Sequence, residues 1–275
     1  MNIGFTKMHG LGNDFIVIEN MNGRIVLSAK QVVLLCDRHK GIGADGVILV
    51  EKSDNADAFM NYYNSDGTVA EMCGNGVRCV AKFLKDEIKK EETNFKIETR
   101  AGIKEIKYKD DGTFSVNMGK PVFEHADFPE KSLELEGLKL DFVSMGNPHA
   151  VAFVENLDDF ILQSIGPLVE NNKNFPNKIN LEIVEKKSDN ELIVKVWERG
   201  CGETLACGTG ACAVYSIMKK NPEGKSTSYG AGKKNSEEII INLPGGKLFM
   251  TENKMGEIIM RGPAESVFNG LVEII

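Results

Sequence analysis

The feature that most constrains this chain is an internal repeat. The pair G-N at residues 12–13 recurs at 146–147, and the motif C-G-x-G that starts at Cys73 recurs at Cys207. Both matches have an offset of 134 residues, because 146 − 12 = 134 and 207 − 73 = 134. One shared offset, close to half of the 275-residue length, indicates a duplicated domain rather than two glycine-rich turns that look alike.

The boundary between the two copies is expected near residues 117–121. An alternating run of Phe114, Val116 and Met118, typical of a strand, meets Gly119 and Pro121 there. The length of 275 residues also suggests two domains, at about 150 residues per domain.

Both copies contain strand and helix patterns. Short β-branched or alternating runs predict strands at 15–18, 46–50, 95–99, 103–108, 150–154, 192–197, 238–243 and 257–261. Helices are predicted at 28–38, with Ser28 as the N-cap, and after each C-G-x-G, at 76–84 and 210–219. The prediction is an α/β (α+β) fold with two pseudo-symmetric domains. Each domain would be a twisted, largely antiparallel sheet wrapped around a central helix.

The charge balance and hydropathy exclude some functions. The chain has 33 Lys and Arg residues against 40 Asp and Glu, a net charge of −7, which argues against nucleic acid or an anionic membrane as its partner. No run of 18 apolar residues predicts a transmembrane helix. The first residues lack the pattern of a secretory signal, so a cytoplasmic location is expected.

The six cysteines divide by their surroundings. Disulfides are not expected in a long chain without a secretory signal, and no C-x-x-C or nearby histidine suggests zinc. The three that lie within helical runs are predicted to be core residues: Cys36, Cys79 and Cys212. No pattern decides the role of Cys201. Cys73 and Cys207, duplicated at glycine-flanked helix starts, are predicted to be catalytic.

Two thiols at helix N-termini suggest a specific chemistry. The unpaired N–H groups and the partial positive charge of a helix start would lower the pKa of each thiol toward neutrality and hold a carboxylate. Pseudo-symmetric halves would then place Cys73 and Cys207 on opposite faces of one α-carbon, in a cleft between the domains. One thiolate could remove the α-proton while the other thiol donates one, which inverts the centre without a redox or metal cofactor.

Five segments carry a resemblance to a known family. The segments NYYNSDGTVAEMCGNGVRC (61–79) and ERGCGETLACGTGAC (198–212), with HGLGNDF (9–15), RHKGIGADG (38–46) and GNPHAV (146–151), resemble those of the diaminopimelate epimerases. The resemblance implies the interconversion of LL- and meso-diaminopimelate, in lysine biosynthesis, without pyridoxal phosphate. It also implies a homodimer, and a final strand at 271–275 that returns to the first domain. The domains would then be 1–118 with 264–275, and 119–263.

The resemblance also implies roles for individual residues. Cys73 and Cys207 look like the acid/base pair, and His149 and Glu198 resemble residues that tune the thiols. The residues that look like ligands of the substrate are Asn13, Asn64, Gly74, Asn75, Asn147, Asn180, Glu198, Arg199, Gly208 and Thr209. Among them Gly74, Asn75, Gly208 and Thr209 resemble the backbone donors to the reacting carboxylate. No residue is expected to bind a metal.

One position departs from the family, and two other functions stay open. Gly46 stands where some members carry a side-chain amide that reaches the substrate. A two-cysteine racemase of the proline or hydroxyproline type would lack a clamp for the distal end of the substrate, so Glu198 and Arg199 discriminate against it. A thiol redox or metal-binding module is the remaining alternative.

Overall fold

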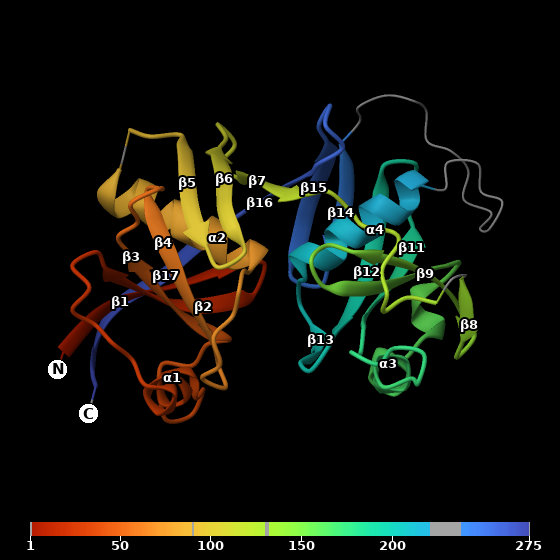
Figure 1. Cartoon of the computed structure of the whole chain (residues 1–275), viewed down its shortest axis with the longest axis horizontal. Helices are drawn as coiled ribbons and strands as arrows, with labels where there is room; N and C mark the ends of the chain where they lie inside the picture. Colours follow the sequence, from red (N-terminus) through yellow and green to blue (C-terminus); the bar gives the residue numbers. More distant parts are fainter. Residues whose placement is uncertain (1, 90, 130–131, 221–237, 275) are drawn as a thin grey trace. The chain divides into compact units, whose positions relative to one another are not determined.

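The computed structural model describes residues 2–89, 91–129, 132–220 and 238–274. These residues form two compact units (Figure 1). Unit 1 comprises Met1–Asn117 with Arg261–Ile275, and unit 2 comprises Met118–Met260. No helix among the described residues is long and apolar enough to cross a membrane.

Unit 1 is built from strands and two α-helices. Its elements are β1 (Asn2–Gly10), β2 (Asn13–Asn20), α1 (Ala29–Cys36), β3 (Gly46–Glu51), β4 (Ala58–Asn64), α2 (Gly74–Phe83), the π-turn η1 (Leu84–Ile88), β5 (Asn94–Thr99), β6 (Gly102–Tyr108), β7 (Phe114–Gly119) and β17 (Glu265–Glu273). Strand β2 pairs parallel with β3, and β4 pairs parallel with β5. The pairs β1–β2, β1–β17, β3–β4, β5–β6 and β6–β7 are antiparallel.

Unit 2 repeats this plan. Its elements are β8 (Leu133–Leu135), β9 (Leu138–Ser144), β10 (Pro148–Val154), the 3-10 turn η2 (Leu157–Asp159), α3 (Leu162–Glu170), β11 (Asn180–Lys186), β12 (Glu191–Glu198), β13 (Gly202–Thr204), α4 (Gly208–Lys220), β14 (Ile239–Leu243), β15 (Gly246–Glu252) and β16 (Ile258–Gly262). Again two pairs are parallel, β10 with β11 and β12 with β14. The pairs β9–β10, β11–β12 and β14–β15 are antiparallel.

The offset found in the sequence carries through the fold. Adding 134 to the first residue of β3, at 46, gives the first residue of β11, at 180. The same sum takes the start of α2, at 74, to the start of α4, at 208. Each residue around one motif therefore has a counterpart at the same place in the other unit.

Each unit wraps its sheet around one helix. Helix α2 packs against β1, β2, β5, β6 and β17, and α4 packs against β9, β10, β11 and β15. Helix residues from Val77 to Ala81 and from Ala211 to Ile217 are buried, because the surrounding strands cover them on several sides. The predicted fold class is confirmed.

The outer face of the sheet in unit 1 carries a second core. Helix α1 is capped by Ser28 as expected, with the Gln31 amide N–H donating to the Ser28 hydroxyl. Its buried face meets residues of β1, β2 and β3, among them Phe5, Ile16 and Val47. This packing fixes β1 and β2, which the G-N motif at residues 12–13 joins.

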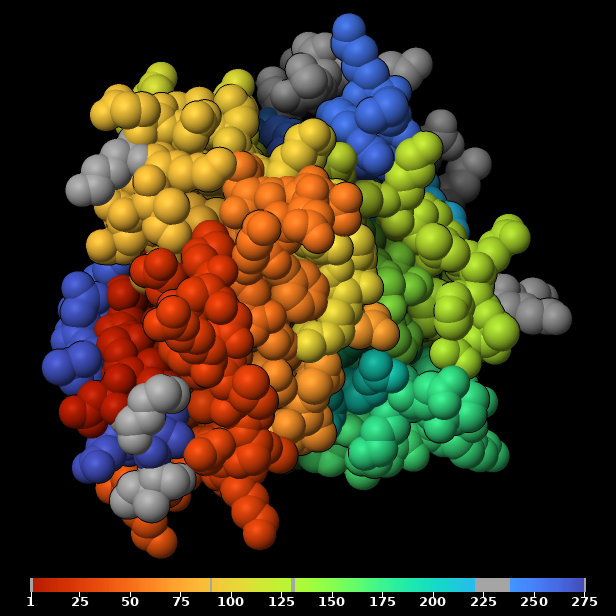
Figure 2. Space-filling model, turned by 60° about the vertical axis from the view of Figure 1, so that its left-hand side comes forward, coloured from red at the N-terminus to blue at the C-terminus, as the bar shows by residue number. Residues whose placement is uncertain are grey.

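The strand and helix patterns predicted from the sequence are all found, some of them longer than expected. The structure adds elements that no pattern indicated, notably α3, β1, β4 and β11. The returning strand is longer than 271–275: β17 begins at Glu265 and pairs antiparallel with β1. In Figure 2, blue surface from the end of the chain adjoins red surface from its beginning. Residue 275 lies outside the described residues.

Candidate functional site

Both candidate cysteines occupy the same local position, immediately before a helix. The carbonyl of Cys73 accepts from the Val77 amide at 2.9 Å, and that of Cys207 accepts from the Ala211 amide at 3.0 Å. These are the first backbone bonds of α2 and α4, so the amides at 74–76 and 208–210 lie at the helix starts and point toward the N-terminal end of each helix. Each motif thus offers a thiol beside a group of N–H donors suited to a carboxylate.

The second glycine of each motif lets the helix approach the sheet. A Cβ on Gly76 would lie 3.2 Å from the Ile48 side chain, and one on Gly210 would lie 2.6 Å from Glu182 Oε1. Any larger residue at Gly210 would push helix and strand apart. The close packing of helix against strand below the thiol therefore requires glycine at this position, in addition to any need for access by a ligand.

The Cys73 cluster comprises Cys73, Asn75, Asn13, Asp45 and Arg78. The Cys73 thiol donates to Asn13 Oδ1 at 3.4 Å, and Asn75 Nδ2 donates to the same oxygen at 3.2 Å. Asn13 Nδ2 in turn donates to Asp45 Oδ2 at 2.8 Å. Asp45 therefore fixes the Asn13 amide with its oxygen toward the thiol.

Arg78 belongs to the Cys73 cluster although the sequence analysis did not single it out. Its side chain is fully buried, and its guanidinium donates to Asn75 Oδ1 at 2.7 Å, to the Gly74 carbonyl at 3.3 Å and to the Pro263 carbonyl at 3.0 Å. Neutral acceptors thus hold the buried cation, which anchors the start of α2 to the returning chain.

Ion pairs support the Cys73 cluster from outside. Asp14 accepts from Arg38 at 2.7 Å and pairs with the buried Lys7 at 2.6 Å. Burial opposes ionisation of Asp14, but hydrogen bonds and charges from Arg38 and Lys7 outweigh it and lower the pKa of Asp14 to about 2. Arg38 also bonds Asp45 at 2.8 Å, which connects this network to Asn13.

Asn64 ends β4, opposite Gly46 in the antiparallel register. Its Nδ2 donates to Thr68 Oγ1 at 3.0 Å, within the turn that follows. At Gly46, a Cβ would lie 2.5 Å from both the Tyr62 ring and the Tyr63 carbonyl. Gly46 therefore lacks the side-chain amide of some family members, and its surroundings are packed too closely for a side chain to enter without a shift.

The Cys207 cluster comprises Cys207, Thr209, Asn147, His149, Glu182 and Glu198. The sulfur lies 3.4 Å from Thr209 Oγ1 and accepts from the Gly210 amide at 3.4 Å. Asn147 Nδ2 donates to Thr209 Oγ1 at 3.3 Å, and Asn147 Oδ1 lies 3.0 Å from His149 Nε2.

The prediction of a lowered thiol pKa is wrong for Cys207. Burial raises the pKa of Cys207 well above its usual value, and the charges of Glu198 and Glu182 raise it further. Hydrogen bonds from Thr209 and the Gly210 amide lower the pKa but do not compensate. The helix start alone therefore does not determine the ionisation of this thiol.

Glu198 lies next to the thiol. Its carboxylate accepts from Thr204 Oγ1 at 2.6 Å and is in hydrogen-bond contact with the Cys207 thiol. Burial raises the pKa of Glu198, and the nearby Glu182 charge acts in the same direction. Glu198 is thus suited to exchange or share a proton with Cys207.

Asn180 and Arg199 are also brought together. The buried Asn180 accepts the Arg199 backbone N–H at 2.9 Å and donates to the Pro148 carbonyl at 2.7 Å. The exposed Arg199 guanidinium donates to the Asn177 carbonyl at 2.8 Å. Adjacent in the chain to Glu198, this exposed cation is available to an anionic ligand.

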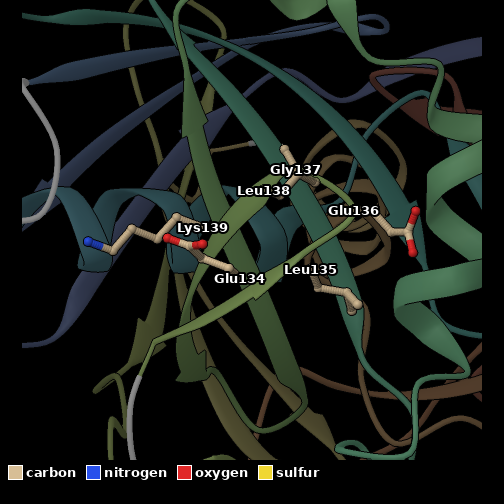
Figure 3. Close-up of a pocket in the computed structure, with 6 residues that line it drawn as sticks. All are labelled: Glu134, Leu135, Glu136, Gly137, Leu138 and Lys139. Carbon is tan, nitrogen blue, oxygen red and sulfur yellow. The ribbon is translucent and has the colours of Figure 1, made fainter.

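The remaining cysteines and one surface hollow lie apart from the candidate residues. All six cysteines lie in the described part of the chain and none is in a disulfide; Cys36, Cys79 and Cys212 are buried, as predicted, and Cys201 is exposed. A hollow on the β8–β9 hairpin is lined by residues 134–139 (Figure 3). There the side chains of Glu136 and Lys139 point in opposite directions, and no candidate residue takes part.

Comparison with known proteins assigns the family. Residues 5–124 and 142–267 match the family described as "Diaminopimelate epimerase". The chain is 41% identical over 292 residues to the diaminopimelate epimerase of Leptospira biflexa, with all of both chains covered. The chain belongs to the diaminopimelate epimerase family.

Solved structures of lower identity share the fold of this family member. A phenazine biosynthesis protein of the PhzF family from Bacillus anthracis matches with a TM-score of 0.72, 18% identity and full coverage of both chains. A hydroxyproline epimerase from Agrobacterium vitis matches with a TM-score of 0.67 and 16% identity, covering 98% of this chain and 91% of that one. Both likenesses concern the fold alone.

Proposed function

We propose that the protein is an isomerase that interconverts LL- and meso-2,6-diaminopimelate, a step of lysine biosynthesis, without pyridoxal phosphate. The observation that carries the proposal is the pair of thiols at equivalent helix starts, Cys73 and Cys207, in a chain of the diaminopimelate epimerase family. Full-length identity of about 40% to named epimerases supports the same substrate.

In the proposed reaction, a proton moves between the two thiols through the α-carbon. One thiolate takes the α-proton and becomes a thiol, leaving a carbanion. The carbanion takes a proton on its other face from the second thiol, which becomes a thiolate. Protons balance, and the enzyme ends with the charge states of Cys73 and Cys207 reversed. The reaction requires both clusters to reach one α-carbon, which we infer from the chemistry.

The amides that follow each cysteine are proposed to hold the reacting carboxylate. The groups concerned are the backbone N–H groups of Gly74, Asn75, Gly208 and Thr209. Because the developing charge spreads onto that carboxylate, fixed N–H donors stabilise the carbanion more than the substrate. Arg199, Glu198, Asn180 and Asn64, with Asn13 and Asn147, are proposed to bind the rest of the zwitterionic substrate.

Incubation in deuterated water tests the function. The reduced protein, mixed with LL- or meso-diaminopimelate and no cofactor, should incorporate deuterium at the α-carbon and convert each isomer into the other. NMR and chiral chromatography measure the two events. Proline and hydroxyproline serve as control substrates and should show no exchange. A folded, reduced protein that exchanges neither isomer would falsify the proposal.

Two further properties belong to the same proposal. A homodimer and a cytoplasmic location are expected from the family resemblance. Analytical ultracentrifugation of the purified protein and fractionation of its source cells test them. A monomer that is fully active, or enrichment outside the cytoplasm, would contradict these expectations without affecting the chemistry.

A further inference from the structure

The Cys207 cluster contains a buried carboxylate that the proposed reaction does not use. Glu182, in the middle of β11, is fully buried, and its Oε1 lies 2.7 Å from His149 Nδ1. Its Oε2 is buried and has no hydrogen-bond partner among the described residues. A buried carboxylate with one oxygen unsatisfied is costly, so its retention calls for a role beyond packing.

The contacts of His149 fix where its proton lies. Nε2 faces Asn147 Oδ1 at 3.0 Å, and an amide oxygen only accepts. Nε2 therefore carries a proton. On the other side, Nδ1 and Glu182 Oε1 share one proton, held either by the ring or by the carboxyl group. In both cases the pair is neutral overall, and His149 acts as a donor toward Asn147.

The direction of donation continues to the sulfur. Asn147 accepts with Oδ1, so its Nδ2 points to Thr209 Oγ1, at 3.3 Å. Since that oxygen accepts from Asn147, the Thr209 hydroxyl hydrogen is left for another partner, and Cys207 Sγ lies 3.4 Å away. Four contacts thus form one chain, in which each donor after Glu182 points toward Cys207.

Among the described residues, the equivalent positions of unit 1 do not carry this hydrogen-bond chain. Subtracting 134 from 182, 149 and 209 gives Ile48, Phe15 and Asn75. Ile48 and Phe15 are buried apolar residues of the core, so unit 1 has no counterpart of the carboxylate–imidazole pair. At the position where unit 1 has the apolar Ile48, unit 2 has the charged Glu182.

We propose that Glu182 is a positioning residue: through His149, Asn147 and Thr209 it orients a hydrogen-bond donor toward the Cys207 sulfur. The donor stabilises the thiolate that Cys207 must form in one direction of the reaction, against the opposition of burial and of the nearby carboxylates. The proposal rests on the proposed function for its importance in turnover, but the chain itself can be tested without substrate.

Four ionisable groups lie together here, three on neighbouring strands and one at the residue before α4. They are His149 on β10, Glu182 on β11, Glu198 on β12 and the thiol of Cys207. Loss of the Glu182 charge alone would make Cys207 easier to ionise. Loss of the oriented donor would make it harder. The direction of the change therefore separates the two effects.

The test is the pH profile of Cys207 alkylation by iodoacetamide, resolved by peptide mass spectrometry in a Cys73→Ala background. Glu182→Leu removes the origin of the chain, and Thr209→Val removes its last donor. Each should move the midpoint to higher pH by about one unit, since a hydrogen bond to a charged group is worth about 1.5–3 kcal/mol. The double variant should move it no further, because both changes break one chain.

Two variants serve as controls. Glu182→Gln can still donate to His149 Nδ1 but removes the charge, so its midpoint should not rise above that of the parent. Glu185→Gln makes the same chemical change on the same strand, at a carboxylate that accepts from the Leu157 amide, and should keep the parent profile. A midpoint that is unchanged or moves to lower pH in Glu182→Leu, or shifts that add in the double variant, would overturn the proposal.

A measurement on the unmodified protein decides the matter if Glu182→Leu does not fold. Nitrogen NMR of His149 should show a proton on Nε2 across the pH range of activity, and a bare Nε2 would overturn the proposal. In turnover, Glu182→Leu should lower kcat about tenfold with little change in KM. If wild-type protein fails to exchange diaminopimelate while the alkylation results hold, the proposed function is wrong and the proposed hydrogen-bond chain is still supported.

Discussion

The two cysteine clusters have the same backbone arrangement but offer their thiols opposite hydrogen-bonding groups, an acceptor to Cys73 and a donor to Cys207. In unit 1, Asp45 holds Asn13 Nδ2, so Asn13 offers its oxygen, an acceptor, to Cys73. In unit 2, His149 holds the oxygen of Asn147, the counterpart of Asn13, so the amide nitrogen points toward Thr209 and the thiol. The duplicated fold fixes where each thiol lies, and diverged buried groups determine how each is hydrogen-bonded.

The buried charges differ in the same way. Arg78, beneath the start of α2, has the neutral Cys212 as its counterpart at 78 + 134. Glu182 and Glu198, beside Cys207, have Ile48 and Asn64 as theirs. One thiol thus lies in a cluster with a buried cation, and the other lies beside two carboxylates. Two inequivalent thiols do not ionise equally, which favours a state with one thiol and one thiolate, the state from which the proposed reaction starts.

The largest test of the comparison is removal of either thiol. Cys73→Ala and Cys207→Ala should each lower epimerisation by about 10³-fold or more, since each loses an obligatory acid or base. The remaining thiol still faces one side of the α-carbon. Each variant should therefore retain slow deuterium exchange with one stereoisomer, and the two variants with different ones. NMR in deuterated water measures this; equal residual exchange of both isomers would contradict opposite-face roles.

A second test places a side chain at Gly46, where unit 2 has Asn180. A Cβ there meets the Tyr62 ring and the Tyr63 carbonyl at 2.5 Å, so Gly46→Ala should lower the free energy of unfolding by about 2–3 kcal/mol. Chemical denaturation measures it. Gly4→Ala is the matched control, because its Cβ would lie 3.8 Å from Leu271 and meet no close contact. Equal stability of the two variants would refute the close approach.

A third test measures how far acid destabilises the protein through Asp14 of unit 1. The pKa of Asp14 is lowered from 3.8 to about 2 in the folded state, so its contribution to stability is complete above about pH 4 and is lost as pH falls toward 2. A lowering of this size corresponds to about 2 kcal/mol of stability. Urea unfolding at several pH values should show this loss in the wild type and not in Asp14→Asn. Asp158→Asn, at an exposed carboxylate, should behave like the wild type.

The repeat made much of the fold predictable. One offset indicated the duplication, and strand and helix patterns around the two motifs located α2 and α4, with Cys73 and Cys207 before them. Helix α3 was missed because Gly166 and Pro167 interrupt its pattern, while Gly166 in the structure packs against Trp197. Local patterns do not reveal such tertiary contacts.

The polarity of the clusters was not predicted, because it depends on burial. A helix start lowers a thiol pKa, but the depth of Cys207 and its two acidic neighbours reverse the sign. The sequence did contain a signal for Glu182 and Arg78. Each is a charged residue whose counterpart at 134 residues is uncharged, Ile48 and Cys212. Comparing the two copies position by position would have found both.

The smallest effect is expected at Asp45, the anchor of Asn13. In the wild type, Asn13 Nδ2 and Arg38 donate to separate oxygens of Asp45. In Asp45→Asn one of these oxygens becomes an NH2 group, so the side chain no longer accepts both bonds. Asn13 loses its fixed orientation and no longer holds its oxygen against Cys73. We expect kcat/KM to fall about fivefold, near 1 kcal/mol, and the alkylation profile of Cys73 to move to lower pH.

The matched control for this change is Asp57→Asn, at a part-buried carboxylate of unit 1 that bonds Lys89 and the Lys96 amide. It should leave both alkylation profiles unchanged. In Asp45→Asn itself, the profile of Cys207 should stay in place while that of Cys73 moves, which is the mirror image of Glu182→Leu. If the alkylation profiles of both thiols shift together, the hydrogen bonding of the two clusters is not independent. Their opposite hydrogen bonds would then belong to one coupled network.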